Sequence, residues 1–428
     1  MRLPKKWFAL LIAAALVVPG ANVAAQDEKI TIAALQGVES QGLEALAPMY
    51  TEATGVEIEI VQSPYGDLFT KLVIAFDTGD ATFDLVMLDD PWMPKFGTME
   101  ALTDLGPLGI EQDPDIAQIV WDVGTWPPPH GAVPPSEVGK PAQLLGVTVV
   151  GNVEMFMYRC DIVADAPASY DDVLANAQAQ NAPEFAGYII RGKATNPVVA
   201  DFLPILWSFG GDVFDDDWNV VLDSAESLAA VKFLVEDLKA VAQADPANTD
   251  AGDRSRLMAI GEGFQSSVWP GEVGTIVLGE GSTVEGKVCF IPIPPGPSGN
   301  GVGMMGNWML AIPKASQNQQ AAADFIKWML QEDTQKTYAQ NTGIPSRTSI
   351  LKDAELAEAN PYFPVLADAL QAPPNWRPRT DQWNAVEAII GTELNGALAG
   401  LKSAEDAVAS AASQIRGLMA GAGYPTAQ

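Results

Sequence analysis

Apolar and polar positions along the first hundred residues predict alternating strands and helices. Residues 29–35 form an apolar run typical of a strand buried on both faces, and residues 56–61 and 84–88 form two further strand-like runs. Between these runs, apolar residues recur at helical spacing over residues 41–54 and 64–76. The order strand, helix, strand, helix, strand predicts a parallel sheet with helices on its faces.

In sheets of this kind, ligands bind beyond the carboxyl ends of the strands. Three loops would meet at that edge, namely Gln36–Gln41, Gln62–Tyr65 and Asp89–Trp92. We therefore expect polar and aromatic side chains of these loops to line a ligand site.

A second α/β stretch follows an irregular, proline-rich segment at 121–146 and begins at Gly146. Its strand-like runs occupy residues 145–150, 153–158, 284–293 and 308–313. Its helical patterns occupy residues 169–180, 198–209, 224–243, 317–331, 383–399 and 403–419. The length of 428 residues predicts two or three domains.

The first 25 residues have the features of an export signal. Arg2, Lys5 and Lys6 precede an apolar run from Trp7 to Val18, and small residues lead to Ala25. This pattern predicts a secretory signal peptide over residues 1–25, cleaved after Ala25. The apolar run of 12 residues is too short to span a membrane comfortably, and no Cys follows it to carry a lipid anchor. We expect an exported, soluble, periplasmic protein.

The net charge and the histidine content exclude several classes of function. The chain has 54 Asp and Glu against 24 Lys and Arg, a formal net charge of −30. This charge argues against nucleic acid and anionic lipid as partners. His130, in the proline-rich loop, is the only histidine, so a histidine-based metal cluster is excluded. A Ser-His-Asp site would have to use His130, for which a solvated loop position is expected.

The chain has two cysteines, Cys160 and Cys289. They could form a disulfide in an oxidising compartment. Two separate buried thiols are the alternative.

Several segments, in this order, carry a resemblance to a known family: Phe83–Pro94, Gly151–Asp161, Ala168–Leu174, Trp308–Pro313 with Ala321–Met329, and Arg377–Trp383 with Leu398–Ala407. No single motif is specific, but their order and spacing extend over the whole mature chain. The chain resembles the extracellular solute-binding proteins of ABC importers, in the carbohydrate-binding group similar to maltose-binding protein. Cys160 departs from this family, which usually has Lys at this position.

The resemblance implies a two-lobed α/β fold, in which each lobe is a sheet with flanking helices and a hinge joins the lobes. It places residues 27–145 and 304–350 in lobe one, and residues 146–303 and 351–428 in lobe two. It also implies a monomer without cofactor or catalytic activity, which captures a carbohydrate or polyol between the lobes and delivers it to a membrane permease.

Sugar binding requires flat aromatic side chains for the C–H faces of the ring and fork-like polar side chains for its hydroxyls. The alternatives are core packing for each Trp, and helix capping or ion pairs for the acidic residues and Arg377. Trp207 and Trp328 are expected to pack in the core, and Asn152 is a weaker candidate near a chain crossing. The candidate ligand-binding residues are Gln36, Glu39, Tyr65, Asp89, Asp90, Trp92, Asp201, Trp269, Asn307, Trp308, Arg377 and Trp383.

Two other functions remain open. Glu39, Asp89, Asp90 and Asp201 could bind a cation such as a polyamine. Asp89 or Asp90, with Asp201, could form the carboxylate pair of an exported glycoside hydrolase. The run Asp215–Asp217 lacks the Gly and distal Glu of a calcium loop, so a solvated turn is expected there.

Overall fold

The computed structural model describes residues 29–372 and 376–425. The predicted signal peptide lies outside the described residues. Within them, no helix is both long and apolar enough to cross a membrane.

The first sheet is built around three parallel strands, β1 (Lys29–Leu35), β2 (Glu57–Ser63) and β3 (Leu85–Asp89). Two more strands extend it, β6 (Val147–Val150) and β10 (Trp308–Ala311). The spatial order is β2-β1-β3-β10-β6, and β10 runs antiparallel to both β3 and β6. The parallel arrangement predicted for the first three strands is confirmed, and β10, which returns from much later in the chain, adds an antiparallel strand to them.

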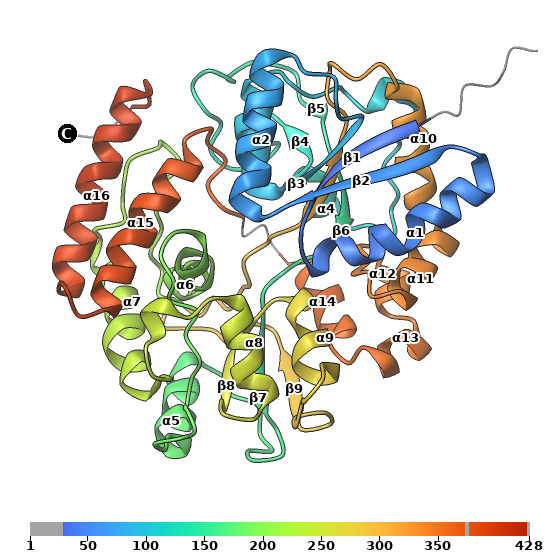
Figure 1. Ribbon diagram of the computed structural model, residues 1–428. Helices are drawn as coiled ribbons and strands as arrows, with labels where there is room; N and C mark the ends of the chain where they lie inside the picture. The colour runs from blue at the N-terminus through green and yellow to red at the C-terminus, as the bar shows by residue number, and fades with distance from the viewer. Residues whose placement is uncertain (1–28, 373–375, 426–428) are drawn as a thin grey trace, which may run out of the picture.

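The second sheet is antiparallel, with the order β8-β7-β9, and lies at the opposite end of the molecule from β1–β3 (Figure 1). Its strands are β7 (Met155–Arg159), β8 (Gln265–Val268) and β9 (Val288–Ile291). A short ribbon joins β4 (Thr125–Trp126) to β5 (Gln143–Leu144).

Helices cover both sheets. Those that pack with the first sheet and its neighbouring core are α1 (Val38–Thr54), α2 (Tyr65–Thr78), α3 (Met93–Thr98), α4 (Gln118–Asp122), α10 (Gln319–Met329), α11 (Glu332–Gln340), α12 (Thr348–Leu351) and α13 (Ala354–Ala359). The next helix, α14 (Phe363–Ala369), packs against β7 of the second sheet. Those around the second sheet are α5 (Tyr170–Gln180), α6 (Asn196–Ser208), α7 (Ala225–Lys232), α8 (Ala251–Ala259), α9 (Pro270–Leu278), α15 (Trp383–Leu398) and α16 (Ala404–Gly421). A π-helical turn, Phe233–Leu238, continues α7.

Two chain segments cross side by side between the sheets. The backbone N–H of Asn152 donates to the side-chain Oδ1 of Asn307 at 2.7 Å. The backbone N–H of Gly306 donates to the backbone carbonyl of Asn152 at 2.8 Å. A third segment joins them where the amide of Gly151 donates to the carbonyl of Ile344 at 3.0 Å. Because β6 pairs with β10, the first sheet extends to Val150, into the segment that the expected division assigns to lobe two.

Cys160 and Cys289 form a disulfide that joins the end of β7 to β9, with 5.7 Å between their Cα atoms. Of the two alternatives left open by the sequence, the structure shows the disulfide. It closes a long loop, because the two cysteines are 129 residues apart.

We expect the double variant C160S/C289S to have a lower free energy of unfolding, by about 2–5 kcal/mol, because an unfolded chain without the cross-link gains entropy. Urea unfolding of both proteins measures this difference. As a control, wild-type protein in strong reductant should unfold like the variant. Equal midpoints in all three samples would show that the disulfide does not stabilise the fold.

Candidate functional site

A cavity of about 640 Å³ lies at the carboxyl ends of β1, β2 and β3, the edge that the sequence predicts for a ligand site. Residues of α6, α8 and α9 form its opposite wall. Its volume is within the range of about 300–1,000 Å³ typical of small-molecule sites. Seven of the predicted residues line it: Gln36, Glu39, Tyr65, Asp89, Trp269, Trp308 and Arg377; the weaker candidate Asn152 lines it too.

Buried ion pairs organise the first wall. Arg377 donates from Nη2 to Oδ1 of Asp89 at 2.9 Å and also binds Asp90, and all three side chains are buried. The hydroxyl of Tyr65 donates to Oδ2 of Asp89 at 2.8 Å. Burial raises the pKa of Asp90 to about 7, although Arg377 opposes this shift. Asp89 thus presents a carboxylate whose charge Arg377 already balances.

An aromatic cluster supports the same wall from behind. Trp92 is completely buried, with its ring centroid 4.9 Å from that of Tyr65 and 5.5 Å from that of Trp308. Trp92 does not line the cavity, so the structure places it as a support for two side chains that do. Such offset and edge-to-face contacts restrict the orientation of the rings.

A second ionic cluster organises the opposite wall. Arg254 is fully buried and binds both Asp201 and Glu272, with Nε 3.1 Å from Oε1 of Glu272. Arg191 lines the cavity and pairs with Asp201 at 2.9 Å. The Glu272 carboxylate also accepts from the amide of Trp269 at 3.0 Å, which fixes the start of α9.

Trp269 rests against the crossing segments. A methyl group placed on Gly306 would lie 2.8 Å from Cζ3 of Trp269. Because Gly306 has no side chain, the indole ring of Trp269 can occupy this space beside the backbone. This contact ties an aromatic side chain of the second wall to the connection between the sheets.

Five predicted residues do not line the cavity, each for a physical reason. Asp90 is held by Arg377, Asp201 is held by Arg191 and Arg254, and Trp92 packs behind the wall. Asn307 is buried, where it accepts from the backbone of Asn152. Trp383 is completely buried in the core around α15. For these five, the structure shows a position outside the lining of this cavity, in contact with groups that form or support its walls.

The sequence analysis missed Arg191, Asn196, Ser255, Glu272 and Thr275, all of which line the cavity. Arg191 follows the apolar residues Ile189 and Ile190, a strand-end signal that could have identified it. Nothing local in the sequence identifies Glu272, whose role depends on the distant Arg254 and Asp201.

Other sequence candidates lie elsewhere. His130 is exposed and its Nε2 is 2.9 Å from Asp122. Asp215 accepts from the amides of Asp217 and Asn219, as in a polar turn. In the described residues, no group of three or more His, Cys, Asp or Glu side chains could hold a metal ion.

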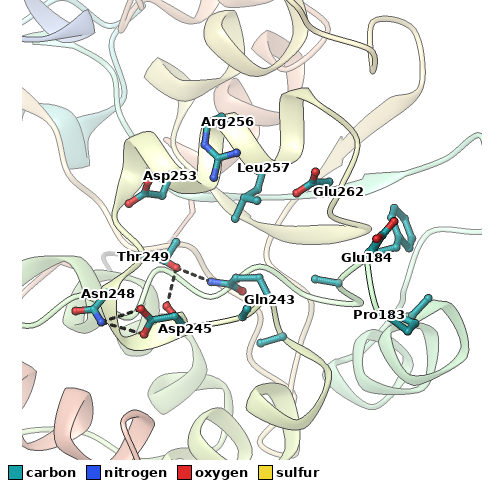
Figure 2. Close-up of a pocket in the computed structure, with 15 residues that line it drawn as sticks. Pro183, Glu184, Gln243, Asp245, Asn248, Thr249, Asp253, Arg256, Leu257 and Glu262 are labelled. Carbon is teal, nitrogen blue, oxygen red and sulfur yellow. Dashed lines mark hydrogen bonds between the residues drawn. The ribbon is translucent and has the colours of Figure 1, made fainter.

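A larger cavity, of about 880 Å³, is formed by residues 182–186 and 242–262 (Figure 2). Several of its polar groups are already partnered, since Asn248 donates to Asp245 and Gln243 donates to Thr249. It receives nothing from the first sheet and no Trp lines it, so it lacks the two opposed walls of the cavity at the strand ends.

Glu39, in the first turn of α1, lies where α1 meets the start of α9. A methyl group placed on Gly271 would lie 3.5 Å from Oε1 of Glu39 and 2.7 Å from Val38. Burial is the largest cause that raises the pKa of Glu39 to about 7; the charges of Glu272 and Asp89 add to this shift, and Arg191 opposes it.

Because the pKa of Glu39 is higher in the folded protein than its ordinary 4.5, the folded state retains a proton that the unfolded state releases. This contribution to stability is present below pH 4.5 and is lost as the pH rises towards 7. We expect Glu39→Gln to remove it, so that the Tm of the variant falls less than that of wild type between pH 5 and pH 8. Thermal melts across this range measure the difference. Glu52→Gln, at an exposed position of α1, should follow wild type, and parallel curves for all three proteins would contradict the assignment.

Comparison with curated proteins finds relatives along nearly the whole chain. The protein is 26% identical over 409 residues to the probable amino-acid ABC transporter periplasmic-binding protein of Sinorhizobium fredii, which covers 93% of this chain and 90% of the relative. It is also 26% identical over 261 residues to the mannitol-binding protein of Pseudomonas aeruginosa, over 56% of this chain and 59% of the relative.

Solved structures share the fold. Maltose-bound MalE3 of T. maritima superposes with a TM-score of 0.79 at 26% identity, covering 91% of this chain and 99% of that one. A solute-binding protein of Agrobacterium radiobacter K84 in complex with ribitol gives 0.81 at 21% identity, over 91% and 98% of the chains. The expected two-lobed α/β fold is confirmed.

The family of bacterial extracellular solute-binding proteins matches residues 36–336, which is most of the chain. This family is exported and binds solutes for ABC importers, as the sequence resemblance implies. The chain belongs to the bacterial extracellular solute-binding proteins.

Proposed function

We propose that the protein captures a neutral carbohydrate or polyol in the cavity at the strand ends and delivers it to a membrane permease, without catalysing a reaction. In this proposal it acts in the periplasm as a monomer, with two lobes close to the expected division, except that β6 belongs to the sheet of lobe one. The observation that carries the proposal is the pairing of Trp269 and Trp308 with polar side chains from both walls of one cavity.

The charges of the cavity support a neutral ligand. The negative charge of Asp89 is paired with Arg377, and the negative charge of Glu272 is paired with Arg254. Glu39 forms no ion pair in the described residues, and its raised pKa keeps part of it uncharged near neutral pH. A hydroxyl can donate to Glu39 or Asp89 and accept from Arg191, whereas a polyamine would find one partly protonated carboxylate.

The ligands named for similar proteins include both sugars and amino acids, so only some of them agree with this proposal. Solved relatives at TM-scores of 0.79 and 0.81 hold maltose and ribitol. A curated relative is named for amino acids, and Arg191 with Glu39 could bind the carboxylate and ammonium of such a ligand. An amino acid is therefore the second candidate.

A thermal-shift panel separates these ligands. We expect maltose, D-mannitol, ribitol or D-tagatose to raise the Tm, since a ligand at 100 times its Kd stabilises the folded state by about 2.7 kcal/mol. The increase should persist in high salt, because a neutral ligand is insensitive to screening. If only amino acids or spermidine raise the Tm, the carbohydrate proposal is wrong.

We expect Gly306→Ala to weaken binding of the sugar found in that panel by about tenfold or more, because the added methyl group displaces the ring of Trp269. Calorimetric titration measures the Kd. Gly274→Ala, in α9, is the matched control, since a methyl group there meets nothing within 4 Å. An unchanged Kd in Gly306→Ala would contradict the proposal that Trp269 contacts the ligand.

A further inference from the structure

A separate cavity of about 550 Å³ lies where three distant segments meet. These are the proline-rich loop at 130–132, the end of α6 with the turn that follows it at 207–218, and residues 376–379 before α15; Asn300 and Val302 complete it. In the described chain, no residue lines both this cavity and the one at the strand ends. We call it the rear cavity.

Two indole rings in the rear cavity are partly exposed. Trp207, expected in the core from the sequence, is only half-buried, and so is Trp376. The ring of Trp376 lies 5.2 Å from the guanidinium carbon of Arg379. Trp207 and Asp212 line the same cavity. Both indole rings are therefore partly accessible to a ligand in the rear cavity.

Two buried aromatic residues, Phe214 and Trp218, also line the rear cavity. Trp218 lies 5.5 Å from Phe214 between ring centroids, and its Nε1 donates to the carbonyl of Val133 at 3.0 Å. This bond fastens the turn after α6 to the proline-rich loop. The cavity wall is thus held by packing and hydrogen bonds instead of by loose loops.

Polar groups surround the indoles. Asp212, Asp216 and Asn300 line the cavity and are accessible to solvent. In the described residues, neither Asp212 nor Asp216 forms an ion pair, in contrast to Asp89 and Glu272 in the first cavity. Flat apolar faces beside carboxylate and amide groups are the combination that a sugar ring requires.

We propose that the rear cavity is a second saccharide site, which takes one sugar or polyol unit against Trp376 and Trp207. The hydroxyls of this unit donate to Asp212 and Asp216, and the amide of Asn300 donates to a ring or hydroxyl oxygen. The inference extends the proposed function, because it assumes the same ligand class.

A saccharide fits this cavity better than an organic cation does. Arg379 is buried in the wall and already makes a cation–π contact with Trp376. An ammonium group on the open face of that ring would meet the guanidinium charge behind it. A neutral ligand avoids this repulsion and still uses both carboxylates.

Fluorine NMR of the mature protein labelled with 5-fluorotryptophan can observe the two cavities independently. Single Trp→Phe variants assign the resonances of Trp269 and Trp308 in the first cavity and of Trp207 and Trp376 in the rear cavity. Maltose and D-mannitol are titrated, with spermidine as the cationic probe. We expect the two pairs of resonances to move with different Kd values.

Variants distinguish direct binding from a relayed change. Trp376→Ala should raise the Kd measured from the rear-cavity resonances by about tenfold or more. The Kd measured from the first-cavity resonances should stay within about twofold of the wild-type value. Trp376→Phe, which retains a flat ring, should restore most of the affinity. In Trp269→Ala, or in Gly306→Ala if that variant does not fold, the Trp207 and Trp376 resonances should still move.

Three results would overturn the rear saccharide site and leave the proposed function intact. In one result, the resonances of Trp269 and Trp308 shift, but those of Trp207 and Trp376 do not shift at any sugar concentration. Another is loss of the rear-cavity shifts when the first cavity is disabled. The third is movement of the rear pair with spermidine alone, which would contradict a saccharide site. Failure of the proposed function gives a different pattern, in which no sugar moves Trp269 or Trp308.

Discussion

Two buried arginines fasten the segment before α15 to the end of β3, and the candidate site depends on this attachment. Arg377 binds the carboxylates of Asp89 and Asp90, and Arg379 donates to the backbone carbonyls of Asp90 and Val123 at 3.0 and 2.8 Å. Burial lowers the pKa of Arg379 to about 10. Because a buried charge that loses its partner is strongly destabilising, these residues are constrained together. Arg377 lines the cavity at the strand ends, whereas Pro378 and Arg379 line the rear cavity, so neighbouring residues of one segment contribute to the two walls.

The two ionic clusters have a common effect on the first cavity. Each places charged groups near the ligand space and neutralises most of them internally, through Arg377 on one side and Arg254 on the other. Charged groups make strong hydrogen bonds, so the walls can orient hydroxyls without presenting a large net charge. An overall negative chain can thus contain a cavity suited to a neutral solute.

The sequence predicts local elements well where hydrophobic periodicity is strong. The run at 29–35 coincides with β1, and the helical patterns at 383–399 and 403–419 closely match α15 and α16. It fails where tertiary contacts decide. β8, with the sequence Gln-Ser-Ser-Val, has no apolar pattern but is fully buried, and the antiparallel insertion of β10 depends on residues far apart in the chain. For the site, aromatic and acidic residues at strand ends were identified, but their division into lining and supporting roles required the positions of Arg191 and Arg254.

The placement of β10 has a consequence for how the protein is made. β10 fills the space between β3 and β6, so the first sheet cannot be completed until residues 308–311 have been synthesised. During synthesis, the amino-terminal two-thirds of the chain therefore contain a sheet with an open centre. Domains tend to fold as units once their residues are available. The interleaved order of strands therefore delays completion of the first sheet until the later part of the chain has been made.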